Sequence, residues 1–173
     1  MQPRRILVST CLLGEPVRYD GQSKPVHHPV LETWQQQGRL LACCPEMLAG
    51  LGVPRLPAEI QGDRVVNIQG TDVTQAFEQG AGLVWALCQK YDISMAVLKE
   101  GSPSCGVRQI NDGTFQGRKI QGQGVTSQCL ILHGIRVFHE HQWEEAYRFD
   151  CALEKLDSVK VNDIVRRVLP SCL

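Results

Sequence analysis

The sequence predicts an α/β domain with a Rossmann-like, mostly parallel sheet flanked by helices, followed by a helical C-terminal tail. Its 173 residues suit one domain at roughly 150 residues per domain, and 43% hydrophobic with 21% charged residues is typical of a globular protein. Short apolar runs alternate with amphipathic segments, an order that favours parallel strands joined by crossover helices. We therefore expect an α/β domain over residues 1–140 and a helical extension over residues 141–173, packed on that domain or trailing it.

Four short segments rich in aliphatic and β-branched residues predict the strands of the sheet. They cover residues 5–10, 40–44, 94–98 and 135–138. Between them the sequence predicts helices over residues 28–37, 73–91 and 126–133. A weak hairpin strand is expected over residues 64–68, after a long loop that contains Pro54 and Pro57.

The helix expected over residues 73–91 is the clearest element, because its apolar side chains recur near the 3.6-residue period. Asp72 and Gln75 resemble a capping box at its start. Gly80 and Gly82 weaken this helix, each by about 1 kcal/mol relative to alanine.

The tail beyond residue 138 is charged and is expected to be helical. Four of its side chains would share one face of that helix, namely Trp143, Ala146, Tyr147 and Cys151. The charged residues of the tail are most simply interpreted as a solvated helix surface.

The charge balance argues against a protein that holds long nucleic acid. Eighteen Lys and Arg residues cancel eighteen Asp and Glu residues, whereas such proteins usually carry a clear basic excess. No apolar run approaches the roughly 20 residues that a membrane helix needs. The short apolar run after Arg5 is typical of a strand rather than a signal peptide, so we expect a cytoplasmic protein.

Eight cysteines are the unusual feature of the composition. In a reducing cytosol, where disulfides are rare, thiols are buried small side chains, metal ligands or reactive groups. Cys11, Cys44 and Cys105 follow predicted strands, and ligands of open α/β sheets usually bind beyond the carboxyl ends of strands. Neighbouring strand residues point to opposite faces, so of Cys43 and Cys44 one faces the site and the other the core. We choose Cys44 for the site because the strand ends there, before Pro45.

The three cysteines form no closely spaced pair, so a shared site depends on the strand ends meeting in space. A closed structural zinc site normally has four ligands, whereas three thiolates can hold a cubane iron–sulfur cluster and leave one iron open. Thiolates suit both metals, and the spacing does not choose between them. The other cysteines are expected to be core residues or incidental tail residues: Cys43, Cys88 and Cys129 in the core, Cys151 and Cys172 in the tail.

Eight short motifs along the chain resemble those of a known protein family. They are residues 8–14 (VSTCLLG), 18–21 (RYDG), 44–46 (CPE), 57–60 (PAEI), 72–74 (DVT), 98–106 (LKEGSPSCG), 112–115 (DGTF) and 122–126 (GQGVT). In this order the set resembles the thiouracil desulfidase family, a bacterial family long known only as a domain of unknown function. The resemblance covers about residues 5–140 and leaves the tail outside it.

The resemblance implies a single-domain enzyme with a [4Fe-4S] cluster held by Cys11, Cys44 and Cys105. In that family the fourth iron captures the sulfur of 2-thiouracil, and hydrolysis yields uracil and sulfide without a net transfer of electrons. The implied partner is a small thiolated nucleobase or nucleoside, with no long nucleic acid and no membrane, in a monomer or weak homodimer. The exact thiolated substrate is left open.

The resemblance also implies catalytic roles for Glu46 and Ser102. Asp20 is a weaker candidate for transferring protons in the reaction. Each has a structural alternative. Glu46 suits the first turn of a helix that begins at a proline, and Ser102 or Ser104 can simply cap a turn. Asp20 precedes a glycine and is equally a turn residue.

An alternative function from a different class is a non-catalytic iron–sulfur or zinc binding or sensing module. It would use the same three cysteines without turning over a substrate. Sulfide release from a thiolated base distinguishes the enzyme from the sensor. The glycines at 122 and 124 are interpreted as a turn before the next helix, with nearby amides as an alternative contact to the base.

Overall fold

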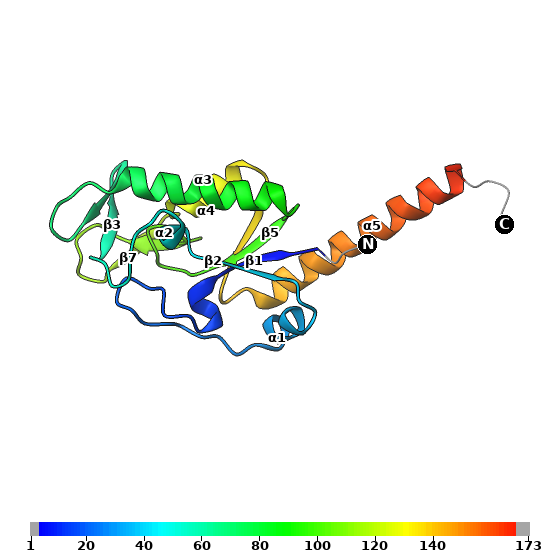
Figure 1. Ribbon diagram of the computed structural model, residues 1–173, viewed down its shortest axis with the longest axis horizontal. Coiled ribbons are helices and arrows are strands. Elements are labelled where there is room, and N and C mark those ends of the chain that lie inside the picture. Colours follow the sequence, from blue (N-terminus) through cyan, green and yellow to red (C-terminus); the bar gives the residue numbers. More distant parts are fainter. Residues whose placement is uncertain (1–3, 169–173) are drawn as a thin grey trace.

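A four-stranded parallel sheet forms the centre of the protein (Figure 1). The computed structural model describes residues 4–168, with side chains as far as Asp157. The strands lie in the order β2-β1-β5-β8 and are β1 (Ile6–Ser9), β2 (Leu40–Cys43), β5 (Met95–Leu98) and β8 (Arg136–His139). All four were expected from the sequence. β1 and β5 are buried along their whole length, which explains why their residues are almost uniformly apolar rather than alternating.

Helices cover both faces of this sheet, as the sequence predicts for an α/β fold (Figure 1). The longer helices are α1 (Pro29–Gln36), α3 (Thr74–Lys90), α4 (Val125–Leu132) and α5 (Trp143–Val168). α3 and α4 pack together over one core, in which Val84 and Leu130 are completely buried. α1 and α5 form the other core around Trp34. Within residues 4–168, no helix combines the length and the hydropathy that a membrane span requires.

Two small antiparallel hairpins lie beyond the carboxyl ends of the central strands (Figure 1). One pairs β3 (Ala58–Gln61) with β4 (Arg64–Asn67), and the other pairs β6 (Gln109–Asn111) with β7 (Lys119–Gln121). Of these four strands only β4 was predicted. The others are three or four residues long, and β7 is exposed throughout, so they lack the hydrophobic alternation that marks a strand in the sequence.

The start of α3 differs from the predicted capping box. The helix begins at Thr74, and the carboxylate of Asp72 accepts hydrogen bonds from the backbone N–H of Thr74 at 3.0 Å and from its hydroxyl at 2.6 Å. Gln75 takes no part in these bonds, so the expected reciprocal box is wrong. The short side chain of Asp72 instead closes a local turn just before the helix.

The two glycines of α3 have different surroundings. A Cβ atom at Gly80 would lie 2.5 Å from the backbone oxygen of Pro45, the first residue of the short helix α2 (Pro45–Leu48). A Cβ at Gly82 would meet nothing within 4 Å. Gly80 is therefore needed for the close approach of α3 to α2, whereas Gly82 has no such packing reason.

The first half of α5 is bound firmly to the α/β body. Asp150 is buried and accepts hydrogen bonds from the guanidinium of Arg39 at 2.5 and 2.8 Å and from the indole N–H of Trp34 at 2.9 Å. Trp143 and Ala146 are also buried, whereas Tyr147 is 41% exposed, so the helix face predicted for these side chains is only partly covered by the body. A buried acidic residue in this helix also departs from the expected solvated surface.

Candidate functional site

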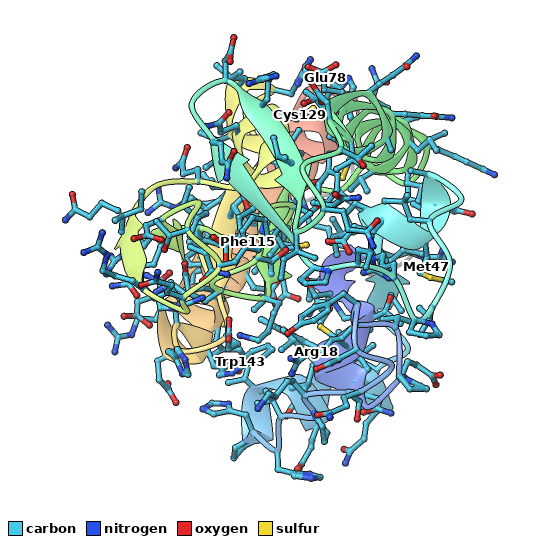
Figure 2. All side chains as sticks on the ribbon, turned by 90° about the vertical axis from the view of Figure 1, so that its left-hand side faces the viewer. Arg18, Met47, Glu78, Phe115, Cys129 and Trp143 are labelled. Carbon is cyan, nitrogen blue, oxygen red and sulfur yellow. The ribbon has the colours of Figure 1, made fainter. Side chains whose placement is uncertain are left out.

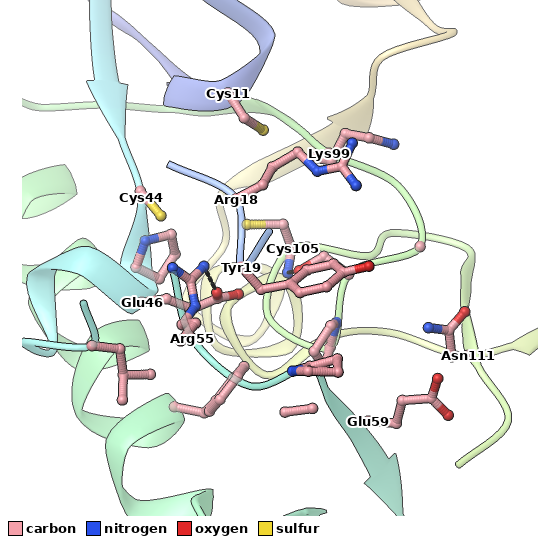
Figure 3. A pocket seen from close by; sticks show the side chains of 18 of the residues that line it. Cys11, Arg18, Tyr19, Cys44, Glu46, Arg55, Glu59, Lys99, Cys105 and Asn111 are labelled. Atoms are coloured by element: carbon pink, nitrogen blue, oxygen red, sulfur yellow. Dashed lines mark hydrogen bonds and ion pairs between the residues drawn. The ribbon is translucent and has the colours of Figure 1, made fainter. Parts of the chain in front are cut away.

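A cavity of about 660 Å³ lies at the carboxyl ends of β1, β2 and β5 (Figure 3). Its walls come from the segments that follow these strands, from α2 and from both hairpins. This edge is where open parallel sheets place their ligands, because the loops after several strands converge there. The volume is typical of a pocket that encloses a small molecule.

The three cysteines expected at the strand ends all line this cavity. Cys11 lies in the short helix η1 (Thr10–Leu13) after β1, Cys44 directly follows β2, and Cys105 lies in the loop after β5. In Figure 3 their side chains come from three sides toward a common space. Cys43 is buried in the core beside Leu7 and borders the cavity, in keeping with the opposite orientations of neighbouring strand residues.

Burial raises the pKa of each of these thiols. The pKa of Cys11 rises to about 11, and Cys44 raises it further because two thiolates would repel each other. The pKa of Cys105 is well above its ordinary value because the side chain is buried and because Glu46, Cys44 and Cys11 lie near it. The three thiols therefore interact with one another, and a cationic group bound among them would favour their ionised forms.

The remaining cysteines lie elsewhere. Cys88, on α3, is buried in the core, as expected. Cys129 is partly exposed rather than buried, and its thiol donates to the backbone oxygen of Ala81 at 3.9 Å. Cys151 is partly exposed on α5, and Cys172 lies outside the described residues.

The loop that carries Cys105 is held by two serines with different surroundings. The Ser102 hydroxyl lines the cavity and accepts the backbone N–H groups of Ser104 at 3.1 Å and Cys105 at 3.0 Å. The Ser104 hydroxyl is completely buried and shares a hydrogen bond of 2.9 Å with Thr126. A Cβ at Gly124 would lie 2.4 Å from the Ser104 backbone oxygen, so this glycine allows α4 to approach the cysteine loop. This close packing adds to the turn that was expected there.

Glu46 lies in the first turn of α2 and lines the cavity. Its carboxylate forms an ion pair with Arg55, drawn in Figure 3, and the two side chains are only 12% and 13% exposed. Burial raises the pKa of Glu46, and the Arg55 cation opposes that rise. Arg55 was missed in the sequence because nothing in the chain between these two residues indicates that they pair.

Asp20 lies outside the cavity lining. Its carboxylate accepts hydrogen bonds from the Arg18 side chain at 2.9 Å and from the backbone N–H of Gln22 at 3.1 Å, an arrangement that stabilises an exposed turn. Its neighbours Arg18 and Tyr19 line the cavity instead. The structure thus brings Glu46 and Ser102 to the site and leaves Asp20 at its margin.

Further charged residues of the cavity come from the loop after β5. Lys99 forms an ion pair with Glu140, which is buried just after β8 and also accepts the backbone N–H of Glu100 at 2.6 Å. The Glu100 carboxylate in turn accepts the backbone N–H groups of residues 107–109. Both Lys99 and Glu100 line the cavity.

The two hairpins contribute Glu59 and Asn111 to the end of the cavity away from the thiols (Figure 3). Phe115, from the loop between β6 and β7, also lines the cavity and lies near the centre of Figure 2. Glu59 belongs to the PAEI motif, and Asn111 immediately precedes the DGTF motif. Those motifs were a signal that these segments matter, but they did not indicate which side chains face the cavity.

The fold and this cavity define an α/β protein that gathers three thiols in a small-molecule pocket at the edge of a parallel sheet. The chain belongs to the 2-thiouracil desulfurase family, whose family model matches residues 6–142. It is 39% identical over 147 residues to the uncharacterized protein YbbK of Bacillus subtilis (strain 168), covering 79% of this chain and 96% of that one. The solved structure of the [4Fe-4S]-dependent thiouracil desulfidase TudS is 51% identical, with a TM-score of 0.80, covering 82% of this chain and 94% of that chain. The resemblance carried by the eight motifs is confirmed.

Proposed function

We propose that this protein is a [4Fe-4S]-dependent thiouracil desulfidase, which converts a thiolated uracil and water into uracil and sulfide. The observation that carries the proposal is the arrangement of Cys11, Cys44 and Cys105 around one small-molecule cavity. Family membership and the 51% identity to TudS supply the reaction class. The conversion replaces a C=S bond by a C=O bond and consumes one water, so it needs no electron donor or acceptor.

The donor set fits an iron–sulfur cluster. Cys11, Cys44 and Cys105 would hold it. A cubane cluster has four irons, so three thiolates would leave one iron without a protein ligand and available to the substrate sulfur. Within the described part of the chain, no three Cys, His, Asp or Glu side chains are spaced to bind a single metal ion. Thiolates on a cubane bind separate irons and need not converge on one point. When bound, the cluster supplies a soft Lewis acid for the thiocarbonyl sulfur.

The protein's own acid–base group in this reaction is Glu46. In its ionised form the carboxylate can accept a proton from the attacking water and later return it to the leaving sulfur. Arg55 holds the carboxylate in place and favours that ionised form. Burial has the opposite and larger effect, so the pKa of Glu46 stays above its ordinary value.

Ser102 orients the ring in this proposal. Its hydroxyl oxygen already accepts two backbone N–H groups, so the remaining function of the hydroxyl is to donate its proton. Because Ser102 lines the cavity next to Cys105, that proton can reach a ring nitrogen or oxygen of a base whose sulfur lies among the thiols. Asp20, at the margin of the cavity, has no direct role in this arrangement.

The test is iron and sulfide analysis of protein purified without air, followed by an assay for sulfide release from 2-thiouracil. We expect Cys105→Ser to lose most of the iron and the activity. Cys129→Ser is the matched control, because it makes the same change at a cysteine that lies outside the cavity lining. Full iron content and activity in Cys105→Ser would contradict the ligand assignment. Iron-loaded protein that releases no sulfide from any thiolated base would favour the binding or sensing module instead.

A second variant tests the acid–base role. Glu46→Gln keeps the shape of the side chain and its hydrogen bond to Arg55 but cannot accept a proton. General acid–base groups typically contribute about 100-fold or more to a rate, so we expect kcat to fall by roughly that factor with the iron content unchanged. An unchanged turnover would remove Glu46 from the mechanism and leave it as the helix-terminal carboxylate that its position also suits.

A further inference from the structure

The end of the cavity opposite the thiols carries two polar side chains whose orientation is fixed by the hairpins (Figure 3). Glu59, on β3, is 4% exposed, and its Oε2 accepts the backbone N–H of Phe115 at 3.0 Å. Asn111, on β6, accepts the Lys119 ammonium group with its side-chain oxygen. Gln61 also donates to the backbone oxygen of Gly113 at 2.6 Å, so the two hairpins are tied together.

These bonds leave one hydrogen-bonding atom free on each side chain. Among the described residues, no partner reaches the Oε1 atom of Glu59 or the Nδ2 atom of Asn111. Because Lys119 occupies the oxygen of Asn111, the amide presents its N–H₂ group to the cavity, and Figure 3 shows that nitrogen pointing inward. The cavity therefore offers an acceptor beside a donor. Glu59 is thus a largely buried carboxylate with one oxygen open to the cavity, where an N–H group of a ligand can donate to it.

We infer that Glu59 and Asn111 determine specificity by hydrogen bonding to the ring edge next to the thiocarbonyl group, and thereby select uracil-type over cytosine-type rings. This inference rests on the proposed function. In 2-thiouracil and in 4-thiouracil alike, the sulfur is followed around the ring by N3–H and then by a carbonyl oxygen. Glu59 accepts from N3–H, and Asn111 donates to the carbonyl oxygen. The same pair therefore serves a thio group at either position.

A cytosine-type ring has the opposite pattern on this edge. In 2-thiocytosine the sulfur is followed by N3 without a proton and then by an amino group. With its sulfur among the thiols, this ring would place a lone pair against the Glu59 carboxylate and an N–H group against the Asn111 amide. Unmatched polar groups in a binding site weaken binding, so we expect kcat/KM for 2-thiouracil to exceed that for 2-thiocytosine by about 10- to 100-fold.

The test exchanges the acceptor and the donor without changing the size of either side chain. In the double variant Glu59→Gln/Asn111→Asp, the glutamine oxygen still accepts from Phe115 and its amide N–H₂ faces the cavity. The new aspartate keeps the interaction with Lys119 and supplies an acceptor. We expect the ratio of kcat/KM for 2-thiouracil to that for 2-thiocytosine to invert. This ratio does not depend on the fraction of protein that carries the cluster.

A binding measurement provides a readout that does not need turnover. Uracil and cytosine lack sulfur, and titration calorimetry should show uracil bound about 10-fold or more tightly than cytosine by the wild type, with the order reversed in the double variant. The single variant Asn111→Asp, on the more exposed hairpin, should lose affinity for uracil even if the double variant is unstable. Glu78→Gln is the control, because Glu78 is exposed on α3 at the edge of the molecule (Figure 2) and should leave both preferences unchanged.

The outcomes separate this inference from the proposed function. If the double variant and Asn111→Asp both keep the wild-type preference while sulfide is still released, Glu59 and Asn111 do not read the base, and the desulfidase function stands. If iron-loaded wild type releases no sulfide, the proposed function fails. In that case equal binding of uracil and cytosine overturns the inference, and a preference for uracil that the double variant reverses supports it.

Discussion

Replacing Gly80 of α3 by alanine should destabilise the protein relative to the same change at Gly82. At an open helix position, glycine to alanine stabilises by roughly 1 kcal/mol, and Gly82 is such a position because a Cβ there meets nothing within 4 Å. At Gly80 the new Cβ would lie 2.5 Å from the backbone oxygen of Pro45 and 3.0 Å from its carbonyl carbon. Both atoms are backbone, so one helix must move. Overpacking of this kind costs about 1–3 kcal/mol.

The gain in helix propensity is common to both variants and cancels in their comparison. We therefore expect Gly80→Ala to be less stable than Gly82→Ala by about 1–3 kcal/mol, which at roughly 2–4 °C per kcal/mol is a readily measured difference in Tm. Thermal unfolding followed by circular dichroism on anaerobically prepared protein measures it. Because Pro45 lies between Cys44 and Glu46, a displaced α2 should also lower the iron content and kcat of Gly80→Ala. Equal stabilisation by the two changes would refute the packing argument.

Two further predictions concern charged pairs. Arg55→Met removes the cation that lowers the pKa of Glu46, so this pKa should rise further. Glu46 should then hold its proton to a higher pH, and the acidic limb of the kcat/KM profile should move to higher pH. A limb that does not move would argue against Glu46 as the titrating group. Arg39→Met leaves the buried carboxylate of Asp150 without its cation and should cost about 3–5 kcal/mol in denaturant unfolding. Arg39→Met/Asp150→Asn, which removes the charge and keeps an acceptor for the indole N–H of Trp34, should recover most of that loss. No recovery would show that the pair does more than neutralise charge.

The central sheet and the longer helices could be predicted because their information is local. β1 and β5 are continuous apolar runs, as expected of parallel strands buried on both faces, and α3 has a periodic apolar face. Cys11 and Cys44 could be placed in a shared site for the same reason, since parallel strands bring their carboxyl ends to one edge. The hairpin strands β3, β6 and β7 could not be predicted, because they are short and are stabilised by pairing and by packing on each other.

The details of the site depended on contacts between residues distant in sequence. Nothing in the local sequence indicates that Arg55 pairs with Glu46 or that Lys119 fixes the amide of Asn111, because side-chain pairing depends on how loops from different strands meet. The place of Asp20 outside the cavity was equally open, since a turn residue and a site residue have the same local pattern. The sequence by itself determined the order along the chain of the central strands and the longer helices, the cysteines that follow the strands, and the family, because these depend on periodicity, chain order and short motifs. Only the tertiary structure decided which charged and polar side chains face the cavity, because that depends on packing between segments that the chain brings together only when it folds.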